Sequence, residues 1–158
     1  DTILKQPRIN RSYHHLSLSQ YSTTGSKIEK MDISSLSSKV EALIILIRRT
    51  STIDTNRFNM SDDLGGILCD SIKLTISNKQ YCDMTNDELY RLNNFKYFNN
   101  CPDYHILTIP FGDKFDHIQP NGYIDFKNIN SALLTITMKS DKPEGNIIDL
   151  YAIRVTTN

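Results

Sequence analysis

The stretch Ser71-Ile-Lys-Leu-Thr-Ile-Ser77 alternates apolar and polar residues without an error. Ile72, Leu74 and Ile76 fall on one side of an extended chain, while Lys73 and Thr75 fall on the other. Because successive side chains of a strand point to opposite faces, this period of two predicts a half-buried β-strand. A second stretch, Val40 to Ile47, is a nearly continuous β-branched and aliphatic run, which predicts a strand buried on both faces.

Strand and turn signals continue through the rest of the chain. Turns are predicted at Asn78-Lys79, at Gln119-Pro120-Asn121-Gly122 and at Asp141–Gly145, where Pro, Asn and Gly supply the required backbone angles. Further strands are expected at Tyr104–Pro110, Tyr123–Phe126, Ala132–Met138 and Ile147–Thr157. Many short strands with regular turns and little helix predict an all-β antiparallel sandwich of the Greek-key kind.

Two segments depart from this pattern. Thr85-Asn-Asp-Glu88 matches a capping box, so a short helix is expected there, and Asn93-Asn94 should limit it to two or three turns. Ser12–Ser38 is rich in Ser and Thr, whose side chains compete for backbone hydrogen bonds. We expect it to be a long loop with one short strand at His15–Ser19. The chain is thus divided into a loop-rich N-terminal segment, 1–37, and a β-domain, 38–158.

Composition narrows the function classes. The chain has 158 residues, enough for one domain with a real core, and its 18 basic and 18 acidic residues give a formal net charge of zero. A protein that coats nucleic acid would carry a basic excess or a basic stripe, so no direct nucleic-acid partner is expected. The longest apolar run, Ala42–Ile47, is far shorter than the roughly 20 residues needed to span a bilayer, so no membrane insertion is expected.

No residue pattern points to catalysis or to a cofactor. Cys69, Cys82 and Cys101 are odd in number and lack metal-ligand spacing, which favours free thiols over a disulfide framework or a zinc site. His14 and His15 are adjacent, so on a strand they would face opposite sides and could not share an ion. No nucleophile elbow, paired carboxylate or glycine-rich phosphate loop is present. We therefore expect no enzyme, no cofactor and no metal.

One stretch carries a more specific signal. Ile106-Leu-Thr-Ile-Pro-Phe-Gly-Asp-Lys-Phe-Asp-His-Ile-Gln-Pro-Asn-Gly-Tyr-Ile-Asp-Phe-Lys-Asn-Ile-Asn-Ser-Ala132 resembles the last part of the double jelly-roll major capsid proteins of nucleocytoplasmic large DNA viruses. In that family a strand with a phenylalanine is followed by a Gln-Pro-Ser/Thr-Gly turn. Here Gln119, Pro120, Asn121 and Gly122 match it, with Asn121 in place of the small hydroxyl residue. The resemblance covers roughly residues 36–158, ending at the closing strand Ile148–Val155.

The resemblance implies an architecture and a role. Two eight-stranded jelly rolls would lie side by side in one polypeptide, and three polypeptides would form a pseudo-hexagonal trimer, the capsomer of an icosahedral shell. The partners would be other copies in the homotrimer, neighbouring capsomers and minor capsid proteins. The location would be the virion, after assembly in the host cytoplasm. The alternatives are a poxvirus-type scaffold protein of the same fold and a carbohydrate-binding β-sandwich module.

The resemblance also implies that the chain is most of the C-terminal jelly roll, without its first strands, and a fragment of a longer polypeptide. Missing strands would expose sheet edges, so we expect the piece not to fold alone as a monomer. The connections 50–70 and 78–102 and the segment Ser12–Ser38 are expected to bury the trimer interface.

Overall fold

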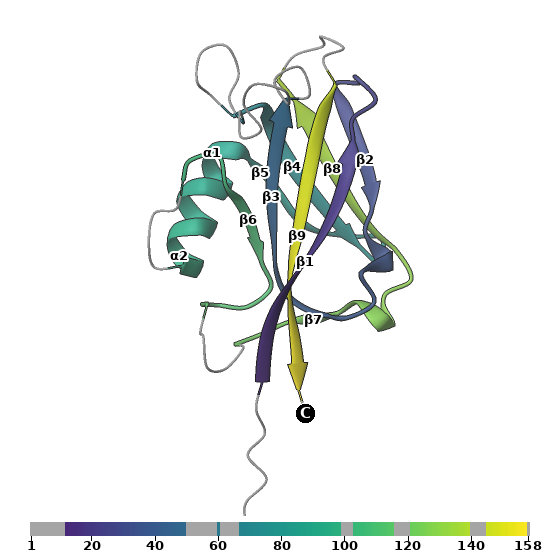
Figure 1. Ribbon diagram of the computed structural model, residues 1–158, viewed down its shortest axis with the longest axis vertical. Helices are drawn as coiled ribbons and strands as arrows, with labels where there is room; N and C mark the ends of the chain where they lie inside the picture. Colours follow the sequence, from purple (N-terminus) through teal and green to yellow (C-terminus); the bar gives the residue numbers. More distant parts are fainter. Residues whose placement is uncertain are drawn as a thin grey trace, which may run out of the picture.

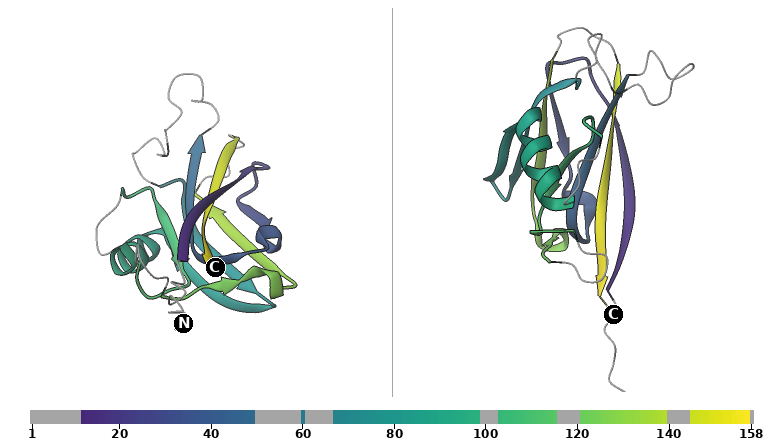
Figure 2. Two further views of the ribbon diagram at one scale, coloured as in Figure 1. Left: turned by 60° about the horizontal axis from the view of Figure 1, so that its bottom comes forward. Right: turned by 90° about the vertical axis from the view of Figure 1, so that its left-hand side faces the viewer.

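The structure, a computed structural model, is a sandwich of two antiparallel sheets (Figures 1 and 2). It describes residues 12–49, 60, 67–98, 103–115, 121–139 and 145–157. Sheet A holds, in spatial order, β1 (Ser12–Ser22), β9 (Asn146–Thr157), β3 (Lys39–Arg49) and β6 (Leu107–Pro110), and the short β7 (Ile124–Asp125) also pairs with β3. Sheet B holds, in spatial order, β2 (Ile28–Asp32), β8 (Ala132–Met138), β4 (Cys69–Ile76) and β5 (Lys79–Thr85).

The order of pairing identifies the fold. With the two-residue β7 set aside, the first strand pairs with the last, the second with the next to last, and so on inward to β4 with β5. Every one of these pairs is antiparallel. A chain that is folded back on itself in this nested way and wrapped into two sheets is a jelly roll. The predicted jelly-roll sandwich is confirmed.

Alternation of apolar residues places the core between the sheets. Ile72 and Leu74 of β4 and Leu134 and Ile136 of β8 point inward and have no exposed surface. From sheet A, Leu43 and Ile45 join the same cluster, as do the aliphatic residues of β9 at 148, 150 and 152. The inward face of each sheet is thus apolar, and its burial supplies most of the stabilisation of the fold.

The expectation of a long loop at Ser12–Ser38 is wrong. This segment contains β1, β2 and a 3-10 turn (η1, Ser34–Leu36). Serine is compatible with the extended chain here because β9 supplies ladder partners along the whole of β1. The short connection between the two strands is ordered by Glu29, whose carboxylate accepts hydrogen bonds from the backbone N–H groups of Thr24 and Ser26.

The expectation that the first strands are missing is also wrong. β1 and β2 are the first two strands of the roll, and they pair with β9 and β8, across the division drawn at residue 37. The described residues therefore form all eight strands of one jelly roll. The reason for expecting the chain not to fold alone no longer holds.

The predicted helix begins at its capping box. Thr85 Oγ1 accepts from the backbone N–H of Glu88, and the Glu88 carboxylate accepts from the backbone N–H of Thr85. The helix then runs through α1 (Asn86–Glu88), a π-helical stretch (η2, Leu89–Asn94) and α2 (Phe95–Phe98). It does not end at Asn93-Asn94 as expected, because both amides find partners on β6, as described below.

Candidate assembly surfaces

The outer face of sheet A, turned away from the core, is apolar. Leu16 and Leu18 of β1 are 63% and 49% exposed, although both are large hydrophobic residues. Beside them lies a groove of about 290 Å³ lined by Leu16, Ile44, Leu46, Phe98, Ile106 and Tyr151. Every one of these side chains except Tyr151 is wholly apolar. An exposed apolar face with a groove is typical of a surface that contacts another protein.

The outer face of sheet B is mostly polar, although Ile28 and Leu133 are exposed on it. Its outward positions on β2, β8, β4 and β5 include Lys30, Thr135, Thr137, Lys73 and Asp83, which sit side by side in the strand register. Lys73 Nζ lies 3.8 Å from the carboxylate of Asp83 on the neighbouring strand. Charged pairs of this kind are well solvated, so burying this face against a partner would contribute little favourable free energy. The two faces of the sandwich are therefore unlike.

The helix covers one part of the outer face of sheet A. Tyr97, which is fully buried, packs there against Ala42 of β3 and Ile153 of β9. Phe98 and Phe115 surround the same small cluster, with ring centroids 5.9 Å apart. The helix lies beside β6 at the flank of the molecule (Figure 1). The helix covers the part of the outer face of sheet A nearest β6 and leaves the part nearest β1 exposed.

The helix also caps the free edge of β6. Phe111 N–H bonds to Glu41 of β3, so by alternation the even-numbered residues of β6 direct their backbone groups away from β3. The carbonyls of Ile106, Thr108 and Pro110 then accept side-chain hydrogen bonds from Asn94, Asn93 and Tyr81 respectively. Pro110 has no N–H to leave unpaired on that side. This edge is therefore closed to any further strand.

A buried carboxylate lies where β1, β3 and the helix meet. The β3–β9 register shifts between Val40 and Ala42, and this bulge places Glu41, whose side chain has no exposed surface. His14 Nε2 lies 2.7 Å from its Oε2. Burial raises the pKa of Glu41, against the opposing effects of His14, Tyr97 and the Asn121 N–H. Burial and the nearby Glu41 raise the pKa of Tyr97 as well.

Glu41 should make stability depend on pH. A carboxyl whose folded pKa lies above its unfolded value holds its proton more tightly in the folded state, so stability falls as pH rises through that interval. Relative to a Glu41→Gln variant, the wild-type free energy of unfolding should decrease as pH increases above about 4.5, the ordinary value for this group. Urea unfolding at a series of pH values measures both proteins. A difference between them that is flat or increases across that range would contradict the expectation.

The turn that carries the resemblance is partly described. Gln119 and Pro120 lie outside the described residues, whereas Asn121 and Gly122 lie against Phe111 and Gly112, just after β6. A Cβ atom on Gly122 would come within 3.0 Å of both Gly112 Cα and Phe111 O. Two backbone segments thus touch here, and glycine permits the contact. The assignment of Gln119–Gly122 as a structural turn motif stays a prediction.

Gly122→Ala should destabilise the protein. The added methyl group meets backbone rather than a flexible side chain, so the expected loss in the free energy of unfolding is about 1–3 kcal/mol. Asn121→Ala is the matched control, since the exposed Asn121 amide makes a 3.3 Å hydrogen bond to Lys114 O. Thermal and denaturant unfolding of the two variants gives the comparison. Equal free energies of unfolding for the two variants would show that the close backbone contact at Gly122 does not require glycine.

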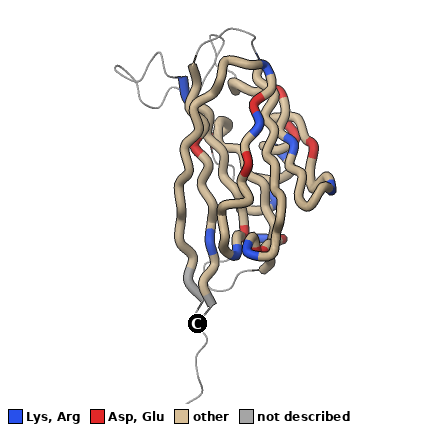
Figure 3. The backbone as a smooth tube through the Cα atoms, turned by 90° about the vertical axis from the view of Figure 1, so that its right-hand side faces the viewer, with Lys and Arg blue, Asp and Glu red and all other residues tan. Residues whose placement is uncertain are grey.

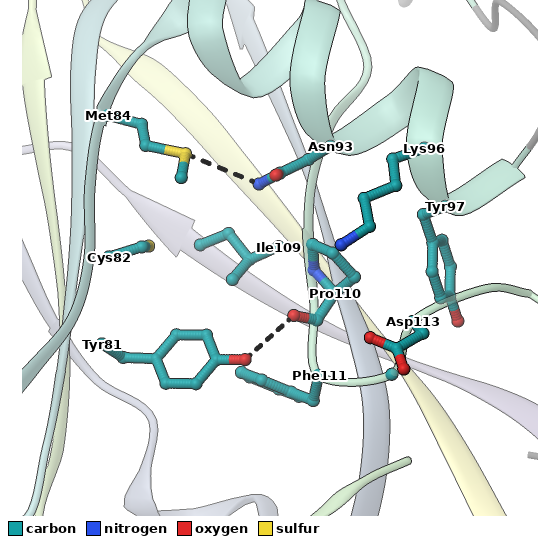
Figure 4. Close-up of a pocket in the computed structure, with 11 residues that line it drawn as sticks. Tyr81, Cys82, Met84, Asn93, Lys96, Tyr97, Ile109, Pro110, Phe111 and Asp113 are labelled. Atoms are coloured by element: carbon teal, nitrogen blue, oxygen red, sulfur yellow. Dashed lines mark hydrogen bonds between the residues drawn. The ribbon is translucent and has the colours of Figure 1, made fainter. Parts of the chain in front are cut away.

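A second hollow lies between β5, β6 and the helix (Figure 4). It has a volume of about 290 Å³, and Tyr81, Lys96 and Asp113 are among its lining residues. Two tyrosines, Tyr81 and Tyr97, are also among its lining residues. Tyr81 packs edge-on against Phe111, Tyr90 against Tyr104, and Phe95 is 63% exposed on the helix.

In the part of the chain that the structure describes, the cysteines and histidines are not brought together into a metal-binding group. Cys69 and Cys82 are free and buried; burial raises the pKa of both thiols, that of Cys69 to about 12. Such thiols are poor nucleophiles and poor metal ligands at neutral pH. Cys101 and His117 lie outside the described residues. His105 pairs locally with Asp103 at 2.9 Å.

Within the described ranges, no group of three or more His, Cys, Asp or Glu residues is placed to hold a metal ion. In the same part of the chain, no helix has the length and apolar character to cross a membrane.

Comparisons with known proteins agree with the fold. No family model matches the sequence, and no curated protein matches it. Among solved structures, the PBCV-1 virus capsid matches with a TM-score of 0.74 and 10% identity, over 94% of this chain and 49% of that one. The Faustovirus major capsid protein matches with a TM-score of 0.75 and 10% identity, over 93% and 34%. The major capsid protein of bacteriophage PM2 matches with a TM-score of 0.59 and 10% identity, over 92% and 46%.

The chain therefore spans half or less of the length of each of these capsid proteins. At this level of identity the likeness concerns the fold. It confirms that the predicted resemblance to jelly-roll capsid proteins holds in three dimensions over nearly the whole chain.

Proposed function

We propose that this chain is one jelly roll of a double jelly-roll major capsid protein, and that its role is structural. The observation that carries the proposal is the nested pairing of eight strands, superposed on about half of the PBCV-1 capsid chain. The neighbours named above are viral capsid proteins. A fold that matches such a protein over one half of its length is what a single roll of a double jelly roll would give.

The surfaces support a role in assembly. Sheet A presents an apolar outer face with a groove, whereas sheet B presents lysine, aspartate and threonine. We propose that the outer face of sheet A contacts the other jelly roll of the same polypeptide. The lengths of the matched chains leave room for a second roll, and the contact would remove the apolar groove from water.

The finer assignments rest on the resemblance. The stretch Ile106–Ala132 favours the C-terminal roll, within a longer polypeptide. Three such polypeptides would form a pseudo-hexagonal trimer in the icosahedral shell of a large DNA virus. Neighbouring capsomers and minor capsid proteins would contact it, in virions assembled in the host cytoplasm. The balanced charge of the chain fits a shell subunit that does not bind the genome directly.

A pair of substitutions tests the role of sheet A in the polypeptide that carries the chain. Leu46→Lys places a charge in the groove, and Leu133→Lys places the same charge on the outer face of sheet B, where Leu133 is 38% exposed. Denaturant unfolding should show that the first change destabilises the polypeptide and that the second does not, because only the first lies in the proposed contact between its two jelly rolls. Equal effects of the two substitutions would contradict the proposed contact.

Two other functions are separated by simple measurements. A poxvirus-type scaffold protein would share the fold, and electron microscopy of its assemblies would show no closed icosahedral shell. A carbohydrate-binding module would use the hollow beside Tyr81, Lys96 and Asp113. Binding to a glycan array that is lost in Tyr81→Ala, without any trimer in solution, would favour that second function over the capsid role.

A further inference from the structure

With the two-residue β7 set aside, the two sheets formed by the described residues have four edge strands, and three of these are protected against pairing with another chain. Side chains cap β6 as described above. β2 has five residues and carries Glu29, Lys30 and Asp32, while β5 carries Lys79 and the Asp83 that faces Lys73. Short length and charge are the usual protections of an edge.

The fourth edge, β1, has none of these features. It is 11 residues long and contains no Lys, Arg, Asp, Glu or Pro. Figure 3 views the molecule from the side of β1 and β2, and the long strand pair at its left carries few charged residues. Within the described chain, β9 is the one strand that pairs with β1. An edge of this kind is a template for a further strand.

The direction of the free backbone groups of β1 follows from its ladder. Thr23 N–H donates to Asn146 O, and the register between β1 and β9 is continuous. Since hydrogen-bonded and non-hydrogen-bonded pairs alternate, the odd-numbered residues of β1 bond to β9. The even-numbered residues direct their N–H and C=O groups to the open side; these are His14, Leu16, Leu18 and Gln20.

The sequence of β1 is nearly the same in both directions about Ser17. Ser-Tyr-His-His-Leu-Ser-Leu-Ser-Gln-Tyr-Ser, read backward, again has Ser at its ends, Tyr next to them and Leu on each side of the centre. In an antiparallel pair of two such strands the facing positions are Ser12 with Ser22, Tyr13 with Tyr21, His14 with Gln20, His15 with Ser19, Leu16 with Leu18, and Ser17 with itself.

We propose that β1 pairs with β1 of a second copy of this chain, antiparallel about a two-fold axis at Ser17, so that sheet A continues across both copies. A two-fold contact of this type needs a self-complementary surface, which the palindromic strand provides. The open backbone groups agree with this register: the even residues face one another as hydrogen-bonded pairs, and Ser17 faces its copy in a non-hydrogen-bonded pair. No charged side chain of β1 meets a like charge across the axis.

Side chains complete the fit. Facing residues in an antiparallel pair lie on the same side of the sheet, and Leu16 and Leu18 both lie on the outer face of sheet A. Leu16 of each copy would therefore lie opposite Leu18 of the other. Four leucines that are exposed in the single chain would form one apolar cluster, and cross-strand pairs of this kind stabilise a sheet. This contact is separate from the proposed trimer; in a shell it would join one trimer to the next.

A disulfide across the axis tests the register. Cα atoms of a non-hydrogen-bonded pair are about 4.5 Å apart, within the range that a disulfide spans. The Ser17→Cys chain should form a cross-linked dimer under mild oxidation. In the Ser19→Cys control the two thiols would be displaced by four residues, about 14 Å at roughly 3.4 Å per residue, and should not link. Wild type controls for the native cysteines. Equal cross-linking of the two variants would overturn the proposal.

Charge at the leucine pair gives an independent test. In Leu16→Lys/Leu18→Lys, lysine faces lysine on both sides of the axis, whereas in Leu16→Lys/Leu18→Glu, lysine faces glutamate on both sides. Sedimentation over a concentration series should show self-association at least about tenfold weaker in the first variant than in the second. Both leucines are exposed, so both variants should fold. Equal association, or a wild-type chain that stays monomeric, would refute the two-fold contact and would leave the proposed jelly-roll role untouched.

Discussion

Leu134→Ala is expected to lower the free energy of unfolding by about 2–5 kcal/mol, because it empties a fully buried site at the centre of sheet B. Leu134 has no exposed surface and faces Leu74 across the β8–β4 pair. Few atoms around it can move to fill the space, since both sheets pack on it. Denaturant unfolding followed by circular dichroism gives the value.

The neighbouring Leu133→Ala is the matched control. This substitution makes the same chemical change on the opposite face of the same strand, where the Leu133 side chain is 38% exposed. Its expected cost is below about 1 kcal/mol, typical of a surface position. If the two changes cost the same, or if Leu133 were the more sensitive, the register of β8 would be shifted by one residue.

The second large effect is expected at the capped edge of β6. Asn93→Ala/Asn94→Ala removes the donors to the carbonyls of Thr108 and Ile106, and Asn94 is 1% exposed. A buried carbonyl left without a donor costs about 1–3 kcal/mol, so the double change should cost about 2–5 kcal/mol. It should also open the edge to pairing with another chain, seen as concentration-dependent aggregation in light scattering.

Leu92→Ala on the same helix serves as the control for that prediction. Leu92 is 57% exposed and lies next to Asn93 in sequence, so its loss tests helix propensity without touching β6. It should leave stability within about 1 kcal/mol of wild type and should not promote aggregation. An Asn93/Asn94 variant that behaves like Leu92→Ala would show that the asparagines do not protect the edge.

Periodicity predicted the strands whose two faces have different surroundings. β4 and β8 alternate because one face meets the core and the other meets water, and the sequence carries that difference directly. The capping box at Thr85–Glu88 was likewise predictable, because its hydrogen bonds are local in sequence. These elements needed no knowledge of the rest of the chain.

The elements that sequence reasoning missed depend on distant partners. β1 is rich in serine and forms a strand because β9, more than a hundred positions away, supplies its ladder. The helix continues through Asn93 and Asn94 because their amides bond to β6. The buried pair of Glu41 and His14 depends on a bulge that no local pattern announces. In contrast, the near-palindrome of β1 is visible in the sequence. It suggests self-pairing only once β1 is known to be an edge strand.

Electron microscopy of the purified polypeptide that carries this chain tests the capsid account most directly. The account predicts particles with three-fold symmetry and a pseudo-hexagonal outline, built from six sandwiches of which three fit the structure described here. Class averages that show a single sandwich, or an assembly without a three-fold axis, would contradict it.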